Sequence, residues 1–187
     1  MLDAVQQASR DQFEKQSDRY GKSHILANIS DVAAGLAGLT FSSGATALDV
    51  ATGGGHTAVY LAGLGLAATA ADISPAMLAN ARKLAEERGH SLETRLHEAE
   101  KFPYADASFD LVTCRVAAHH FSDCGAFLRE VVRVLKPGGY FLLIDGSVPD
   151  GEPGAEEWIH QVEKLRDPSH GRFLSPGAWS ALCGSAA

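Results

Sequence analysis

The 187-residue sequence has few cysteines and no long hydrophobic run. No apolar stretch approaches the roughly 20 residues that a transmembrane helix needs, and residues 1–22 are too polar to contain the apolar core of a secretion signal. Cys114, Cys124 and Cys183 show no paired spacing, which argues against a disulfide scaffold or a zinc site. These absences predict a cytoplasmic protein with no membrane span and no bound metal.

Positive charge is also scarce. The chain carries 16 Lys and Arg against 23 Asp and Glu, a formal net charge of -7, and it has no basic cluster. A nucleic-acid partner is therefore disfavoured. Hydrophobic residues make up 45% and charged residues 21% of the chain, as in ordinary globular proteins. The length suits one domain, residues 1–187.

Predicted strands alternate with predicted helices along most of the chain. The apolar runs that read as short buried strands are residues 45–51, 67–71, 92–96, 109–114 and 140–144. Helical spacing of apolar residues, with caps and glycine stops, predicts helices within residues 1–22, 25–36, 56–64, 75–88, 124–135, 154–166 and 176–183. This alternation predicts an α/β fold with a Rossmann-like, mainly parallel sheet flanked by helices.

Three consecutive glycines, Gly53 to Gly55, join the first strand to the helix after it. Glycine lets the backbone approach a ligand closely, and a helix N-terminus offers unpaired N–H groups. A side chain at Gly53 or Gly55 would obstruct that approach. With Asp72 following at a suitable distance, the pattern also fits the dinucleotide fingerprint of NAD-dependent oxidoreductases. Taken alone, the glycines indicate either a nucleotide site or a tight structural connection.

Further motifs stand in a fixed order around these glycines. They are Leu48-Asp49-Val50-Ala51-Thr52-Gly53-Gly54-Gly55, Asp72 before Ser74-Pro75, Glu98-Ala99-Glu100, and Leu135-Lys136-Pro137-Gly138-Gly139. From Leu48 through Asp145 the chain resembles the class I S-adenosylmethionine-dependent methyltransferases, above all their small-molecule, UbiE-like (type 11) branch. The resemblance implies a lid or lead-in helix at 1–22, a cofactor-binding core at 23–146 and a partial substrate-side region at 147–187. It also implies a sheet that lacks the family's last two strands.

The resemblance implies S-adenosylmethionine as cofactor and S-adenosylhomocysteine as product. Asp49 would orient the glycine loop or meet the cofactor's ammonium group, and Asp72 would accept hydrogen bonds from both ribose hydroxyls. Ile73 would pack on adenine, which Glu98 and the Ala99 N–H would hold. Ala51 and Glu98 depart from the family, which has glycine and aspartate there. The full set implied is Asp49, Ala51, Gly53, Gly55, Asp72, Ile73, Glu98, Ala99 and Arg115.

His119 and His120 follow the fourth predicted strand, at the expected mouth of the active site. Histidine is the natural base near neutral pH, so either is a candidate catalytic residue. Because they are adjacent, they should point in different directions, and at most one should act. The alternative is a histidine packed against Phe121. Candidate substrate-binding residues are Asp145, Arg166 and His170. The alternative for Asp145 is a helix cap, and the alternative for the segment that contains Arg166 and His170 is a solvated turn.

The predicted function is methyl transfer to a small-molecule nucleophile by in-line displacement. The alternatives are an NAD-dependent oxidoreductase and a non-catalytic S-adenosylmethionine-binding protein. The Asn/Asp-Pro-Pro-Tyr motif of many nucleic-acid and protein amine methyltransferases is absent after the fourth strand. The last predicted strand, Tyr140 to Ile144, contains no charge or proline to protect a sheet edge. It therefore predicts either a homodimer or a longer natural chain that covers the edge.

Overall fold

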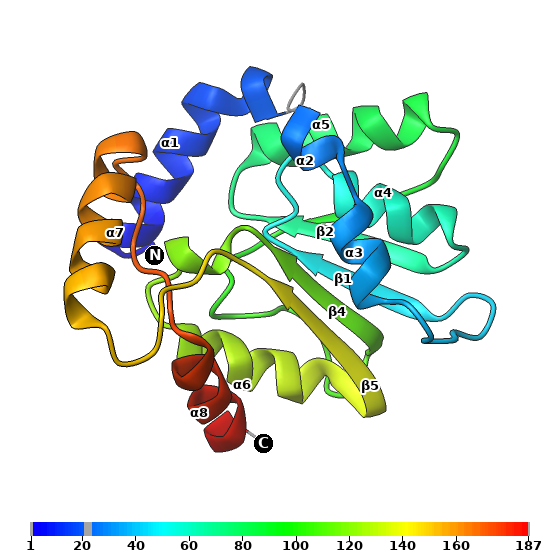
Figure 1. Cartoon of the computed structure of the whole chain (residues 1–187). Helices are drawn as coiled ribbons and strands as arrows, with labels where there is room; N and C mark the ends of the chain where they lie inside the picture. The colour runs from blue at the N-terminus through cyan, green and yellow to red at the C-terminus, as the bar shows by residue number, and fades with distance from the viewer. Residues whose placement is uncertain (1, 21–23, 187) are drawn as a thin grey trace.

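A computed structural model describes residues 2–20 and 24–186. Its core is one sheet of five strands in the order β3-β2-β1-β4-β5 (Figure 1). All four strand pairings are parallel, which confirms the predicted α/β fold. The strand order reverses between β1 and β4, and ligands of such sheets bind at this position. The strands are β1 (Thr46–Val50), β2 (Ala67–Asp72), β3 (Glu93–Leu96), β4 (Phe109–Arg115) and β5 (Leu135–Ile144).

Helices cover both faces of the sheet (Figure 1). One face carries α3 (Ser30–Gly35), α4 (His56–Gly63) and α5 (Pro75–Glu87), and the other carries α6 (Cys124–Val134). Side chains alternate between the two faces of a strand. Leu48 of β1 therefore packs in the core cluster that contains Phe127 of α6. Its neighbour Ala47 packs with Val32 of α3 and Leu61 of α4.

The remaining helices pack around this layered core. α1 (Ala4–Tyr20) contacts α5 and the short 3-10 helix η1 (Ala118–His120). α8 (Pro176–Ala186) packs against α6, while α2 (His24–Ala27) and α7 (Pro153–Arg166) complete the described chain. The side chain of Gln6 in α1 donates a 2.9 Å hydrogen bond to Glu100. None of the helices in residues 2–20 and 24–186 combines the length and apolar character needed to cross a membrane.

The helix predicted over residues 25–36 is interrupted. The chain forms two short helices, α2 and α3, with Asn28 and Ile29 between them. The guanidinium of Arg115 donates to the carbonyl oxygens of Leu26 and Asn28 at 2.8 and 2.7 Å. The Asn28 side chain also accepts from the N–H of Ser30 at 3.0 Å. These bonds pair backbone groups outside a helix and so compete with helical ones.

Strand β5 is longer than predicted. It begins at Leu135, so it includes Lys136-Pro137-Gly138-Gly139, which was expected to be a turn. The register shifts here, because Phe109 pairs with Leu135 while Leu111 pairs with Tyr140. In the described chain β5 lies at the sheet edge, as predicted. Tyr140 to Ile144 contain no charge or proline, but the added first half of the strand contains Lys136 and Pro137, and such residues hinder edge pairing.

Candidate cofactor and active site

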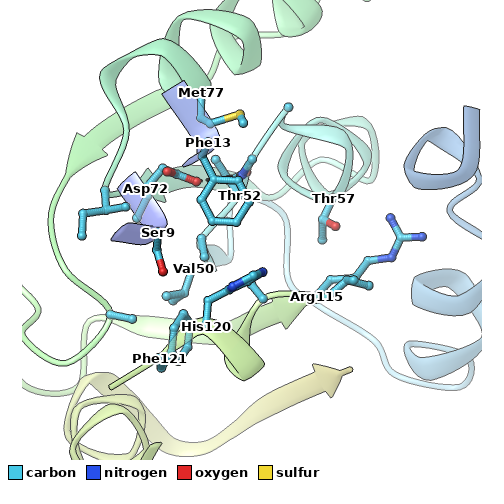
Figure 2. A pocket seen from close by; sticks show the side chains of 18 of the residues that line it. Ser9, Phe13, Val50, Thr52, Thr57, Asp72, Met77, Arg115, His120 and Phe121 are labelled. Carbon is cyan, nitrogen blue, oxygen red and sulfur yellow. Dashed lines mark hydrogen bonds between the residues drawn. The ribbon is translucent and has the colours of Figure 1, made fainter. Parts of the chain in front are cut away.

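A cavity opens at the carboxyl ends of β1 and β4, where the strand order reverses. The space inside it, counted out to its solvent-open mouth, is about 940 Å³. Segments after β1, β2 and β4 form its floor and sides, and α1 lies against it with Ser9 and Phe13 (Figure 2). The labelled lining residues are Ser9, Phe13, Val50, Thr52, Thr57, Asp72, Met77, Arg115, His120 and Phe121 (Figure 2).

The glycines after β1 serve two different purposes. Gly53 lines the cavity with a φ of 53°, and a Cβ built on it would meet nothing within 4 Å. Gly55 is absent from the cavity lining. It precedes α4 with a φ of 86°, and a Cβ there would lie 2.6 Å from the Cβ of Ala81 in α5. Gly53 therefore leaves backbone open to a ligand, whereas Gly55 allows α4 to pack closely against α5.

Asp49, in β1, bonds the start of the glycine loop from inside the protein. Its carboxylate accepts hydrogen bonds from the hydroxyls of Thr52 at 2.6 Å and Thr113 at 2.7 Å. The side chain is buried, and this burial raises the pKa of Asp49 to about 6. It is not among the residues that line the cavity. Of the two roles that the sequence left open, the geometry favours orienting the loop over meeting the ammonium group.

Asp72 places a carboxylate at the cavity from the end of β2. One oxygen accepts from the N–H of Gly53 and the other from the N–H of Ser74, both at 2.9 Å. Burial raises the pKa of Asp72 to about 6 in spite of these two bonds. A carboxylate offers about four acceptor positions, so capacity remains for two further donors. Two adjacent hydroxyls are a ligand group that matches it.

The other residues predicted to hold the cofactor meet the expectation in part. Ile73 after β2 and Ala99 after β3 line the cavity, as does Ala51 after β1, which has a left-handed φ of 53°. Glu98 lies outside the cavity lining and borders a neighbouring hollow. Glu100, two residues further along, lines the cavity instead and accepts from the side chains of Gln6 and Ser122, each at 2.9 Å. The carboxylate beside the cavity in this loop is therefore that of Glu100.

Arg115 lines the cavity with its stem, but its guanidinium turns away from the centre (Figure 2). Its Nε donates to Asp31 at 2.7 Å, in addition to the bonds to the carbonyls of Leu26 and Asn28. The side chain is 10% exposed. Arg115 thus clamps the segment between α2 and α3 against the end of β4, and its charge is already paired. Its place in the cavity lining is the one that the resemblance implied, and a contact between Arg115 and the cofactor stays a prediction.

We expect Arg115→Met to lower the free energy of unfolding by at least about 2 kcal/mol, because hydrogen bonds to charged groups contribute roughly 1.5–3 kcal/mol each. Urea denaturation measures this loss. The matched control is Arg95→Met, which removes an exposed arginine paired with Glu93 on β3. Exposed pairs contribute about 0–1 kcal/mol. Equal losses in the two variants would show that Arg115 clamps nothing.

The two adjacent histidines point to different surroundings. Asp145 accepts from the backbone N–H of His119 at 2.9 Å and lies 2.6 Å from its Nδ1. His119 is not in the cavity lining, whereas His120 is. The His120 ring meets the ring of Phe13 in an edge arrangement, with 4.9 Å between centroids. Burial lowers the pKa of His120 to about 4. One histidine of the pair therefore reaches the cavity.

The three residues suggested for substrate binding do not line this cavity. Asp145 is engaged by His119, and the exposed Arg166 pairs with Glu163 of its own helix. His170 is buried, with its Nε2 3.2 Å from Nδ1 of His160. Each of the three side chains already has a partner within the described chain. No three His, Cys, Asp or Glu side chains in the described ranges gather where they could hold a metal ion.

Sequence reasoning missed Ser9. Its hydroxyl is buried, lines the cavity and has no hydrogen-bond partner in the described chain. A buried polar group without a partner is costly, so this oxygen suits a ligand that can pair with it. The neighbouring Phe13 stands out in the sequence as an apolar residue in a polar helix. No such signal distinguishes Ser9 from the other polar residues of α1.

The parallel sheet, the glycine loop after β1 and the acidic end of β2 define a nucleotide-cofactor site of the class I methyltransferase type. Residues 48–143 match the family model described as Methyltransferase domain. The chain belongs to this family of S-adenosylmethionine-dependent methyltransferases, in the UbiE-like branch that the sequence resembles. The comparisons do not favour the oxidoreductase or non-catalytic alternatives.

Relatives and solved structures agree with this assignment. The chain is 35% identical over 171 residues to the uncharacterized methyltransferase YcgJ of Bacillus subtilis strain 168, covering 91% of this chain and 67% of YcgJ. It is 39% identical over 115 residues to the ubiquinone/menaquinone biosynthesis C-methyltransferase UbiE of Nitrobacter hamburgensis, covering 59% and 45% of the two chains. A crystal structure of a putative methyltransferase from Bacillus halodurans C-125 superposes with a TM-score of 0.79 at 37% identity, covering 84% and 68%.

The curated relatives are longer than this chain. It spans 67% of YcgJ, 58% of the Escherichia coli protein YafE and 41% of a Chlorobaculum parvum demethylmenaquinone methyltransferase. The cofactor of the family is S-adenosylmethionine. The described residues fit it, because Asp72 retains capacity for a pair of hydroxyls and Gly53 leaves open backbone beside the same cavity.

Cofactor binding should weaken in acid. A charged Asp72 accepts hydroxyl donors, and its pKa in the free protein is raised to about 6. Below that pH, binding must displace a proton, so affinity for S-adenosylhomocysteine should fall up to about tenfold per pH unit and level off above pH 7. Calorimetry between pH 5 and 8 measures this. The pKa of Asp49 lies in the same range. Asp72→Asn should make affinity independent of pH, which would assign the effect to Asp72 and not to Asp49. A flat profile in the unmodified protein would contradict the assignment.

Proposed function

We propose that the chain transfers the sulfonium methyl group of S-adenosylmethionine to a small-molecule acceptor. The observation that carries the proposal is the buried Asp72 carboxylate beside the open backbone of Gly53, both facing one cavity. Apolar side chains dominate the cavity beyond these groups, among them Phe13, Met77 and Phe121. A planar aromatic acceptor of the quinol or phenol type suits such walls. Relatives named demethylmenaquinone methyltransferase support this class.

The residues around the cavity divide the task of holding the cofactor. Asp72 accepts from the ribose hydroxyls, Ile73 and Ala99 flank the adenine, and the backbone at Thr52 and Gly53 faces the methionine part. The bound cofactor supplies an electrophilic methyl group on a positively charged sulfur. Fixing an acceptor in line with that methyl can account for several kcal/mol of barrier lowering. Helix α1 covers part of the same space with Gln6, Ser9 and Phe13.

Two measurements test the function in order. Calorimetry with S-adenosylhomocysteine and with NAD should give binding of the first and none of the second. Turnover with S-adenosylmethionine and 1,4-naphthalenediol, catechol and 4-nitrophenol, followed by mass spectrometry, should then reveal a methylated product. Binding of NAD in place of S-adenosylhomocysteine would overturn the proposal, and cofactor binding without any product would reject the quinol or phenol class.

We also propose that the protein is cytoplasmic and that it forms a homodimer through the edge of the sheet. The thiols of Cys114 and Cys124 are unpaired, which suits a reducing compartment. In the described chain β5 pairs with β4 along one side, and the half from Tyr140 to Ile144 is uncharged. Light scattering should give a mass of two chains for the unmodified protein and of one chain for the Leu142→Pro variant. A concentration-independent monomer would exclude the dimer.

A further inference from the structure

The two ring nitrogens of His120 have different surroundings. Nδ1 lies 3.1 Å from the carbonyl oxygen of Ser169. A carbonyl can only accept, so this contact places the proton on Nδ1 and leaves the lone pair on Nε2. The hydroxyl of Ser169, 3.4 Å from Nδ1, donates its own proton to Asp167 at 2.7 Å. Both oxygens of Ser169 are thus acceptors toward Nδ1.

Nε2 of His120 makes no hydrogen bond within the described chain, and the ring lines the cavity. The carboxylate of Asp167 lies 3.9 Å from it, beyond hydrogen-bond distance. An unpaired acceptor nitrogen on a cavity wall is the arrangement that a general base requires. His119 differs, because its Nδ1 faces Asp145 and its ring lies outside the cavity lining.

A tight turn fixes Ser169 in this position. Asp167 accepts from the N–H of Ser169 at 2.9 Å as well as from its hydroxyl, an Asx-type turn. The turn is then bonded to η1, since the N–H groups of Gly171 and Arg172 donate to the carbonyl of His119 at 2.9 and 3.0 Å. A Cβ on Gly171 would lie 2.6 Å from that carbonyl oxygen, so glycine permits the approach.

We propose that Asp167 and Ser169 are positioning residues that hold His120 in the tautomer protonated on Nδ1, so that Nε2 accepts the proton released at methyl transfer. The proposal rests on the proposed function. As the acceptor atom bonds the methyl carbon, the methyl–sulfur bond breaks and its electron pair stays on sulfur. The electrons of the acceptor's bond to hydrogen remain on the acceptor, and its proton passes to Nε2. The substrate class is an acceptor with an ionisable hydrogen, such as a phenolic hydroxyl.

The surrounding charges suit this role. Burial lowers the pKa of His120, and neighbouring His119 lowers it further, while Asp167 and Asp145 raise it. The ring is therefore neutral at pH 7. Helix α1 presents the uncharged ring of Phe13, and His170 lies beyond His119 with 5.3 Å between the ring centroids. Once His120 is protonated, Asp167 is the carboxylate within 3.9 Å of Nε2 and stabilises its charge.

Long-range ¹⁵N–¹H NMR of the full chain, labelled in histidine, reads the tautomer directly. With S-adenosylhomocysteine bound at pH 7, Nε2 of His120 should resonate as an unprotonated ring nitrogen and Nδ1 as a protonated one. The same spectra should show this histidine titrating near pH 4 in the free protein. A proton on Nε2 at pH 7 would overturn the proposal. The free protein gives the same tautomer test should the cofactor fail to bind.

Two substitutions separate positioning from general structure. Asp167→Ala removes the turn and should produce a mixture of tautomers, whereas Asp167→Asn can still accept from Ser169 and should keep the proton on Nδ1. Because the charge of Asp167 raises the pKa of His120, Asp167→Asn should also lower the pH at which His120 titrates. The control is Asp150→Ala, which removes a carboxylate that accepts from Gly177 and leaves the turn intact. Identical tautomers in Asp167→Ala and the unmodified protein would refute the positioning role.

Kinetics then test the proton transfer on whichever probe acceptor is methylated. His120→Gln should lower kcat about 100-fold or more, as general bases contribute roughly 10²–10⁴-fold, while affinity for S-adenosylhomocysteine changes less than about threefold. An unchanged kcat would exclude His120 as the base while leaving the methyltransferase function standing. If no cofactor binds at all, the proposed function fails, and the tautomer result remains as a separate finding.

Discussion

Asp72→Ala should weaken S-adenosylhomocysteine binding at least tenfold. The carboxylate is buried at the end of β2, and the two N–H groups that donate to it leave room for both ribose hydroxyls. Charge-assisted hydrogen bonds contribute about 1.5–3 kcal/mol each, and the loss of about 1.4 kcal/mol already corresponds to a factor of ten. The substitution also leaves the N–H groups of Gly53 and Ser74 without their acceptor, which adds to the effect. Isothermal titration calorimetry gives the change in Kd.

A second aspartate provides the control for this experiment. Asp110 on β4 bonds Thr46 and Lys136, both at 2.7 Å, and does not line the cavity. Asp110→Ala should lower stability while cofactor affinity stays within about threefold. Circular dichroism establishes that each variant is folded. An Asp72→Ala protein that is folded and binds with unchanged affinity would remove Asp72 from the site.

The parts of the site that lie at strand ends could be predicted from sequence. Asp72 and Gly53 each sit within a few residues of a recognisable strand, and a parallel sheet brings those ends together. The order of short motifs therefore determined which residues meet at the cavity. The same logic located His120, which follows β4 directly, although it could not separate His120 from His119. Which histidine reaches the cavity depends on Asp145, which follows β5 and lies 2.6 Å from Nδ1 of His119.

Side-chain direction was the part that sequence could not supply. Glu98 and Glu100 belong to one short loop, and Glu100 reaches the cavity because Gln6 and Ser122 bond its carboxylate there. Arg115 ends β4 beside the cavity, yet its guanidinium bonds Asp31 and turns away from the cavity centre. Each outcome is decided by partners distant in the chain, such as Gln6, which is 94 residues from Glu100. Short motifs contain no information about these partners.

Gly55→Val should destabilise the fold, and Gly53→Val should block the cofactor. Both glycines have positive φ, so either substitution costs about 1–3 kcal/mol of backbone strain. At Gly55 the new side chain would also collide with Ala81, because even its Cβ lies 2.7 Å from the Ala81 Cα. Overpacking of this kind costs typically about 1–3 kcal/mol more. At Gly53 the Cβ meets nothing, and the side chain instead takes space in the cavity.

Urea denaturation and calorimetry on the two variants separate these effects. We expect Gly55→Val to lose about 2–6 kcal/mol of unfolding free energy, the sum of strain and overpacking. Gly53→Val should lose the strain component alone and yet bind S-adenosylhomocysteine at least about 100-fold more weakly, or about 2.7 kcal/mol. If Gly53→Val binds the cofactor normally, the glycine loop does not touch it, and the cavity beside Asp72 must hold its ligand by other groups.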